Sequence, residues 1–289
     1  MSKKAIQANR ALLLSKELPP DDHWTKNGPK LQAFATKQPL IKWLELLEKS
    51  SPESHSASEG YVFKVMIDSK LYALKFKFFK PSTHRYLLNN IIGKNITDQR
   101  LAFHTDPFYA ECRAYGRIRE AELKGCPRIA AKCYGFLRLT RRDELVLAER
   151  GIDLWEDIPE DDEYRQREEG SPIRAILKEF IEENESTPAM NLKTLKAIRK
   201  NIFALNRQGI LHRDIRASNF VAGLLVDFGA AWTEPHCIID AVPARLSQDW
   251  RDDDVCMFDE MVEELGFTLG DIRATPNPSY LKNLRSWNC

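Results

Sequence analysis

The sequence predicts an α+β fold with a strand-rich lobe and a shortened helical lobe, preceded by a helical extension. Alternating apolar and polar residues at 60–67 and 71–78 indicate two strands joined by a tight turn. Apolar residues then recur at helical spacing from Leu192 to Leu205, and Gly209 ends this helix. The chemically active residues follow it directly. We place the three parts at residues 1–50, 51–181 and 182–289.

The composition is that of a folded protein without a strong net charge. Of the 289 residues, 43% are hydrophobic and 10% aromatic, which is enough for a sizeable core. The formal net charge of +1 gives no sign of binding to nucleic acid or to an anionic membrane. No apolar run is long enough for a transmembrane helix, and the N-terminal residues lack a secretory signal. We therefore expect an intracellular protein of the nucleus or cytoplasm.

The first 122 residues carry signals for three helices and an insertion. Residues 1–30 predict a short amphipathic helix followed by a linker. Apolar residues recur at helical spacing over residues 38–49, which predicts a second helix. Residues 81–105 have the character of an insertion. The next helix begins after Asp106, an N-cap acid followed by proline, and runs through Glu122.

The segment after the next strand allows two interpretations. Residues 131–139 predict the strand itself. Residues 144–149 could then form the hinge strand that links the lobes. However, Thr140 and Asp143 have the spacing of a capping box, which favours a helix from 141 to 150.

If residues 141–150 form a helix, the hinge must lie farther along the chain. Residues 156–170 are acidic and predict a loop. We place the hinge at residues 173–181, where backbone amides from Glu179 through Phe180 to Ile181 would meet a bound ligand.

The spacing of two acids and an amide in residues 211–232 is typical of ATP phosphoryl transfer. A His-Arg-Asp tripeptide ends at Asp214, Asn219 follows five residues later, and Asp227 begins an Asp-Phe-Gly tripeptide. Asp214 would take the proton of the attacking hydroxyl, whereas Asn219 and Asp227 would supply oxygen ligands to Mg²⁺. Short strands on either side of Gly223 would form a hairpin that brings these two ligands together.

A lysine and a glutamate upstream complete the expected ATP site. Lys75 ends a Tyr-Ala-Leu-Lys run at the position of a phosphate-binding lysine, and Glu111 is expected to hold it by an ion pair, with Glu120 as the rival. Gly60 occupies the last position of a glycine loop. The two earlier glycine positions are His55 and Ala57, so fewer backbone amides can approach phosphates.

The segment after the Asp-Phe-Gly tripeptide is short. Thr233 is the only hydroxyl residue from Ala230 to Val242, which leaves little for a phosphorylation switch and no phosphate for Arg213 to clamp. A last helix is expected after the acidic residues 252–254, through Glu264. The six cysteines form no C-x-x-C pair, so we expect reduced thiols, and no metal other than Mg²⁺.

These motifs resemble the protein-kinase-like superfamily over about residues 58–265, which implies a two-lobed kinase-like fold that uses ATP and Mg²⁺. The run Ile215-Arg216-Ala217 is similar to the tyrosine-kinase form of the loop and implies a catalytic role for Arg216. Residues 106–116, 172–180 and 226–236 are similar to a family of filamentous-fungal proteins classed with the kinetochore subunit FTA. That family has a kinase-like fold with degenerate motifs, whereas the two tripeptides are complete here.

Three hypotheses follow. The first is an ATP- and Mg²⁺-dependent kinase that phosphorylates a protein hydroxyl, on serine or threonine rather than tyrosine. The second is a pseudokinase scaffold, in a fungal kinetochore complex, that presents a surface to protein partners. The third is a phosphotransferase for small molecules, which fits the shortened helical lobe.

Overall fold

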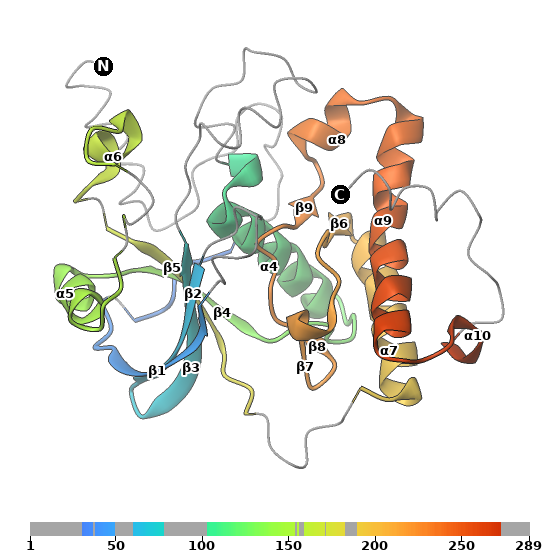
Figure 1. Cartoon of the computed structure of the whole chain (residues 1–289), viewed down its shortest axis with the longest axis horizontal. Helices are drawn as coiled ribbons and strands as arrows, with labels where there is room; N and C mark the ends of the chain where they lie inside the picture. Colours follow the sequence, from blue (N-terminus) through green and yellow to red (C-terminus); the bar gives the residue numbers. More distant parts are fainter. Residues whose placement is uncertain are drawn as a thin grey trace.

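The chain combines an antiparallel sheet with a group of helices, so the predicted α+β class is confirmed (Figure 1). Among the residues described, no helix has the length and apolar character needed to cross a membrane. The structure, a computed structural model, describes residues 31–36, 38–49, 60–77, 103–153, 155, 159–170, 172–182 and 190–272.

Five strands form the sheet in the order β1-β2-β3-β5-β4, and all neighbours pair antiparallel. The hairpin predicted at residues 60–78 is present as β2 and β3. The strands are β1 (Lys42–Lys49), β2 (Gly60–Ile67), β3 (Lys70–Lys77), β4 (Cys133–Arg138) and β5 (Arg174–Glu179).

The helix predicted over residues 38–49 is wrong, because β1 forms the edge strand of the sheet there. Ile41 and Trp43, two residues apart, are both buried, as the pleat of a strand requires. Register shifts next to Trp43 and Leu46 then change which side chains face the core. These two irregularities broke the alternation and gave the apolar residues an apparent helical spacing.

One face of the sheet packs under helix α5 (Arg141–Glu149). The rings of Trp43, Phe63 and Phe76 pack against one another, with centroids 5.2 to 6.2 Å apart. Asp143, whose capping box with Thr140 is formed, also accepts a hydrogen bond from Trp43 Nε1 at 3.3 Å. Residues 141–149 are therefore helical, and the hinge strand is not there.

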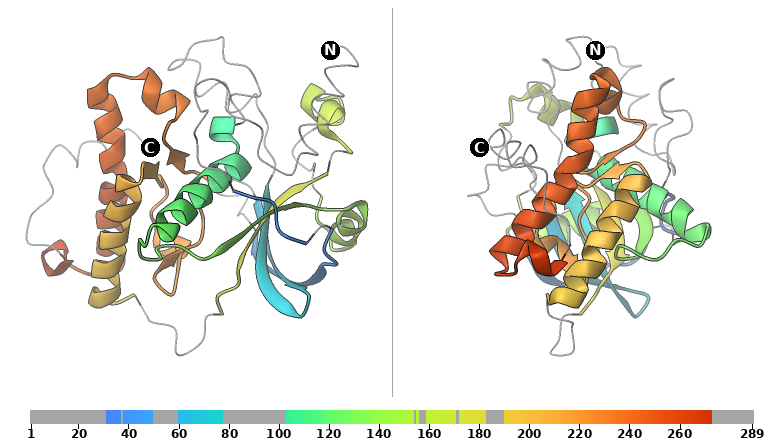
Figure 2. Two further views of the ribbon diagram at one scale, coloured as in Figure 1. Left: turned by 180° about the vertical axis from the view of Figure 1, so that it is seen from behind. Right: turned by 90° about the vertical axis from the view of Figure 1, so that its right-hand side faces the viewer.

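The opposite face of the sheet packs against helix α4 (Pro107–Leu123), which lies between the sheet and the helix pair α7 (Leu192–Arg207) and α9 (Ala244–Glu264) (Figures 1 and 2). As predicted, Asp106 caps α4, accepting from Phe108 N at 2.8 Å. The same carboxylate lies 2.6 Å from the Arg174 guanidinium on β5, which ties the start of the helix to the sheet.

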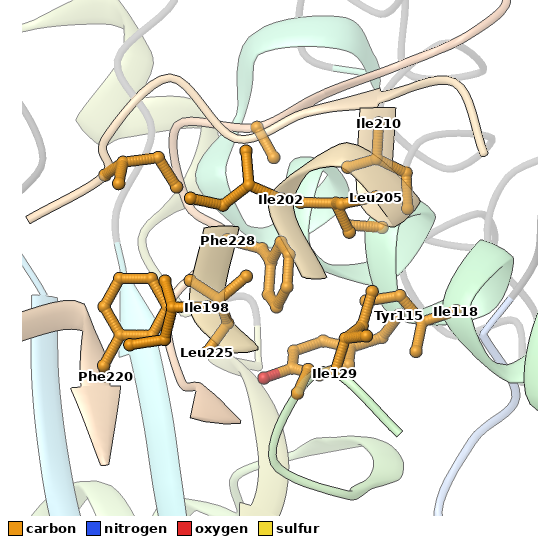
Figure 3. Close-up of a cluster of buried hydrophobic side chains, with 14 of the residues drawn as sticks. Tyr115, Ile118, Ile129, Ile198, Ile202, Leu205, Ile210, Phe220, Leu225 and Phe228 are labelled. Carbon is orange, nitrogen blue, oxygen red and sulfur yellow. The ribbon is translucent and has the colours of Figure 1, made fainter. Parts of the chain in front are cut away.

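A second core lies between α4 and α7 (Figure 3). Tyr115 comes from α4, Ile198 and Ile202 from α7, and Phe228 from the Asp-Phe-Gly tripeptide. Ile210, Phe220 and Leu225 also belong to this core. They lie on the short strands β6 (Ile210–Leu211), β7 (Phe220–Val221) and β8 (Leu224–Leu225), of which β6 pairs with β9 (Trp232–Thr233) and β7 with β8. The chemically active loops are therefore continuous with a packed core.

Several boundaries differ from those predicted. The acidic residues 156–170 include a short helix, α6 (Glu163–Glu168). The last long helix starts at Ala244 instead of after residues 252–254. Two further short helices are α8 (Cys237–Ala241) and α10 (Leu269–Ile272). The helix expected in residues 1–30, most of the insertion at 81–105, and the glycine-loop positions 55 and 57 lie outside the described residues.

Gly135 is predicted to be essential for the contact between β4 and the segment before β1. It has a φ of +128°, and a Cβ there would lie 2.6 Å from Gln32 O and 2.9 Å from Phe34 N. We expect Gly135→Ala to lower the free energy of unfolding by about 3 kcal/mol or more, measured by urea denaturation.

Gly151→Ala is the matched control, because Gly151 also has a positive φ, +76°, but no atom lies within 4 Å of its added Cβ. It should cost only the backbone strain, about 1 to 2 kcal/mol. Equal losses in the two variants would contradict the close approach at Gly135.

Candidate functional site

Lys75 is placed by the sheet and held by two carboxylates. It lies on β3 opposite Ile176 of β5, and its side chain is only 4% exposed. Its Nζ lies 2.5 Å from Glu111 Oε1 on α4 and also forms an ion pair with Asp227 Oδ1. The rival, Glu120, instead lies 3.7 Å from Arg117 on the same helix. The predicted ion pair between Lys75 and Glu111 is therefore present.

The two carboxylates keep Lys75 charged despite its burial. Burial alone would lower its pKa, but the charges of Asp227 and Glu111 outweigh that effect and raise the pKa above its ordinary value. The side chain is thus a fixed cation beneath the sheet at neutral pH. Such a cation suits the recognition of phosphate.

Asp214 and Asn219 are joined by hydrogen bonds within one short loop. Residues Ala217–Asn219 form a 3₁₀ turn, and Asn219 Nδ2 donates to Asp214 O at 2.7 Å and to Asp214 Oδ2 at 2.8 Å. The amide oxygen of Asn219 is therefore the end of the group directed away from Asp214. Arg216 lies 3.4 Å from Asp214 Oδ2, and both side chains are partly exposed.

The hairpin of β7 and β8 brings Asp227 back to this loop. Its turn uses Ala222 and Gly223, with φ values of 51° and 75°, as expected for a two-residue turn with both residues left-handed. Val226 N then donates to Asn219 O at 3.1 Å, and Gly229 N donates to Asp227 Oδ1 at 2.7 Å. The predicted hairpin thus holds Asn219 and Asp227 side by side.

Phe228 and Asp254 anchor this loop to the helices. The Phe228 ring lies 5.0 Å from the ring of Tyr115 and 5.0 Å from that of His212 (Figure 3 shows Phe228 and Tyr115). Asp254 of α9 is fully buried and accepts from the backbone N–H groups of His212 and Arg213, each at 2.7 Å. A buried carboxylate that accepts several such bonds fixes the backbone firmly.

Arg213 packs on a tryptophan. Its guanidinium carbon lies 3.6 Å from the ring centroid of Trp232, a cation–π contact. Arg113 of α4 donates to the carbonyls of Thr233 at 2.7 Å and Pro235 at 2.5 Å. Thr233 is only 1% exposed. Arginines and buried contacts therefore hold residues 230–242 in place. The one hydroxyl residue of this segment, Thr233, is buried.

The residues predicted to form the hinge lie at the end of β5 and just after it. Of the amides near Glu179 to Ile181 that are predicted to meet a ligand, the N–H of Glu179 instead donates to Lys132 O at 2.8 Å. Its carboxylate pairs with Arg128 and accepts from Lys132 N. The Phe180 ring lies under Lys64 Nζ at 4.4 Å, and Gly60 opens β2. Lys132, the residue before β4, therefore accepts from one of the amides that the sequence analysis assigned to a ligand.

Comparison with known proteins identifies the family of this chain. The chain matches the family described as kinetochore Sim4 complex subunit FTA2 over residues 14–232, which is more than half of its length. The chain belongs to the FTA2 family. No curated protein matches it. The span that matches this FTA2 family includes Lys75, Glu111, Asp214 and Asp227, whereas Asp254 lies beyond it.

Among the residues that the structure describes, two sets in this FTA2-family chain have metal-ligand chemistry. Asn219 and Asp227 offer amide and carboxylate oxygens, the donors that Mg²⁺ prefers. His104, His236 and Cys237 also lie together, with ligand atoms within 4.8 Å of one another. However, His236 Nδ1 accepts from Ile238 N at 3.3 Å, and its Nε2 faces His104 O at 3.0 Å. His236 is therefore occupied as the cap of α8.

Sequence reasoning missed two buried charges at this site of the FTA2-family chain. Asp254 was grouped with its acidic neighbours at the start of a helix, although it is the only one of the three that is fully buried. Lys178 is only a member of the hinge segment 173–181 in the sequence analysis, although it is 4% exposed and 3.3 Å from Glu111. Its place directly after the apolar residues 175–177 was the one available signal.

The burial of His236 predicts a loss of stability at acidic pH. Burial, aided by the charge of Arg113, lowers its pKa from about 6.5 to about 3. The unfolded chain therefore binds a proton below about pH 6.5 that the folded chain does not. The stability is complete above that pH and falls towards pH 3, by about 1.4 kcal/mol per pH unit.

Urea denaturation of the wild type and His236→Asn between pH 7 and pH 5 would measure this effect. Asparagine keeps a side-chain acceptor for the helix cap but does not titrate. The variant should be less stable at pH 7 yet lose less stability on acidification. Equal slopes against pH would show that His236 is not the group responsible.

Proposed function

We propose that this chain is a kinetochore complex subunit that acts in the nucleus through protein partners and that carries a site for ATP and Mg²⁺. The family match supports the first part. The observation that carries the second is the position of Lys75, which pairs at once with Glu111 and Asp227 beside the Asp214–Asn219 loop.

A protein-kinase-like fold is part of this proposal. The lysine on the third strand, its glutamate partner on the helix beneath the sheet, and the loop that follows α7 have the relationships that kinases use to hold ATP. Lys75 would contact the phosphates. Phe180, at the end of β5, would lie beside the adenine, and Gly60 would lie over the phosphates.

The oxygen donors fit Mg²⁺. The Asn219 amide is oriented by its two bonds to Asp214, and the Asp227 carboxylate by its bonds to Lys75 and Gly229 N. When bound, the ion would neutralise part of the phosphate charge. The protein's own contribution is to hold the oxygen atoms of Asn219 and Asp227 in position before the nucleotide and the metal ion bind.

Several features favour a binding module over rapid turnover. The amide of Glu179 is already bonded, and two glycine-loop positions are His55 and Ala57, so fewer backbone donors are available to a nucleotide. In the part of the chain that the structure describes, only α10 follows α9. In this proposal, ATP stabilises a surface for kinetochore proteins.

Calorimetry of ATP binding tests the nucleotide site. The wild type should bind ATP in a Mg²⁺-dependent way, and Lys75→Met and Asp227→Asn should each bind at least about tenfold more weakly, because a charge-assisted contact is lost. Glu120→Gln is the control, because Glu120 is an exposed glutamate of α4, the helix that carries Glu111. This variant should bind ATP as the wild type does. Absence of binding at millimolar ATP would refute the site without affecting the family.

A second candidate function is phosphoryl transfer to a serine or threonine hydroxyl. The specific observation in its favour is the Asp214 carboxylate, which is oriented by Asn219 and is 38% exposed, within reach of a substrate. Arg216 lies beside it and would stabilise its charge.

Phosphate transfer to a protein library, or to small-molecule alcohols, would test this candidate. Asp214→Asn should lower the rate by about 10² to 10⁴ while ATP binding is kept. If wild type and Asp214→Asn label substrates equally, the transfer does not come from this site. The class of the labelled molecule would separate a protein kinase from a small-molecule phosphotransferase.

A further inference from the structure

A second buried lysine faces the same glutamate as Lys75. Lys178 on β5 is 4% exposed, and its Nζ lies 3.3 Å from Glu111 Oε2 and 2.6 Å from the carbonyl oxygen of Val226. Lys178 pairs with Ala73 on β3, and Lys75 pairs with Ile176, so the two lysines lie on neighbouring strands. Each oxygen of Glu111 therefore has a lysine of its own.

The four charged groups balance one another. Lys75 and Lys178 face the carboxylates of Glu111 and Asp227, and three of the four side chains are at most 5% exposed. Removing one partner from a buried ion pair is costly because it leaves an uncompensated charge. Here Glu111 keeps a partner even if one lysine turns elsewhere.

Lys178 also reaches the residue that precedes Asp227. The Val226 carbonyl accepts from Lys178 Nζ and, at 3.4 Å, from the Tyr115 hydroxyl on α4. One side chain thus connects the sheet, the helix that carries Glu111, and the strand end that presents Asp227. These three elements supply the residues of the proposed nucleotide site.

We propose that Lys178 is a positioning residue: it holds Glu111 and Val226 so that α4 and Asp227 stay in place when Lys75 engages the phosphates of a nucleotide. This inference rests on the proposed ATP site. It explains why the sheet carries two lysines for one glutamate.

A double-mutant cycle without nucleotide tests the sharing of Glu111. Lys75→Met and Lys178→Met each leave Glu111 with one lysine, whereas the double variant leaves it with none. We expect the melting temperature of the double variant to fall by at least about 3 °C more than the sum of the two single losses. Additive losses would overturn the proposal.

Lys70→Met is the matched control for this cycle. Lys70 is an exposed lysine of the same sheet, and its Nζ donates to the Tyr134 hydroxyl at 3.1 Å. Its loss should add to that of Lys178→Met without coupling. Coupling of the same size would show that any lysine of the sheet gives the effect, and the sharing of Glu111 would be refuted.

The same cycle in a Glu111→Gln background shows whether charge is responsible. Glutamine keeps the shape but carries no charge, so the coupling should disappear, whereas coupling through packing would persist and overturn the proposal. If the double variant does not fold, Glu111→Gln should restore folding. Failure to restore it would also overturn the proposal.

Calorimetry on Lys178→Met then tests the link to the nucleotide site. We expect Mg²⁺·ATP binding to weaken about tenfold, because Asp227 loses part of its support. Unchanged affinity would refute a positioning role. If the wild type itself binds no ATP, the proposed nucleotide site fails, whereas the cycle still decides whether Lys178 and Lys75 share Glu111.

Discussion

The buried carboxylate of Glu111 is the constraint on which the arrangement of the sheet and the helices depends. A carboxylate that is only 2% exposed must be paired, and its partners, Lys75 and Lys178, both come from the sheet. Helix α4 can therefore occupy only a position that brings Glu111 between these strands. The pair of Asp106 with Arg174 fixes the start of the same helix, so α4 is attached at two points.

From this fixed helix, contacts extend to the loops that carry the other polar residues. Tyr115 supports Phe228, and Arg113 holds the carbonyls that follow Trp232, while Asp254 of α9 holds the loop of Asp214 from the other side. These contacts use only groups of the chain itself. The acids, the amide and the lysine are consequently held in position by contacts within the chain, which supports the proposal of a preorganised site.

Local patterns were sufficient for the elements whose chemistry is local. The hairpin around Gly223, the cap at Asp106 and the helix of Leu192–Arg207 each follow from neighbours within a few residues. Spacing also identified Asp214 and Asp227. By contrast, the strand β1 and the burial of Lys178 and Asp254 depend on partners far along the chain. Local sequence patterns do not show which residues those partners are. The amide of Glu179 bonds to Lys132, just before β4, for the same reason, since strand pairing is a long-range choice.

The chain belongs to the FTA2 family, and the ion pairs of Lys75 with Glu111 and Asp227 support the proposed site for ATP and Mg²⁺. The most direct test is a crystal structure with Mn²⁺ and a non-hydrolysable ATP analogue, in which anomalous scattering locates the ion. The account predicts an anomalous peak between the Asn219 amide oxygen and the Asp227 carboxylate. A map without a peak there, or with its peak at His104, His236 and Cys237 instead, would contradict it.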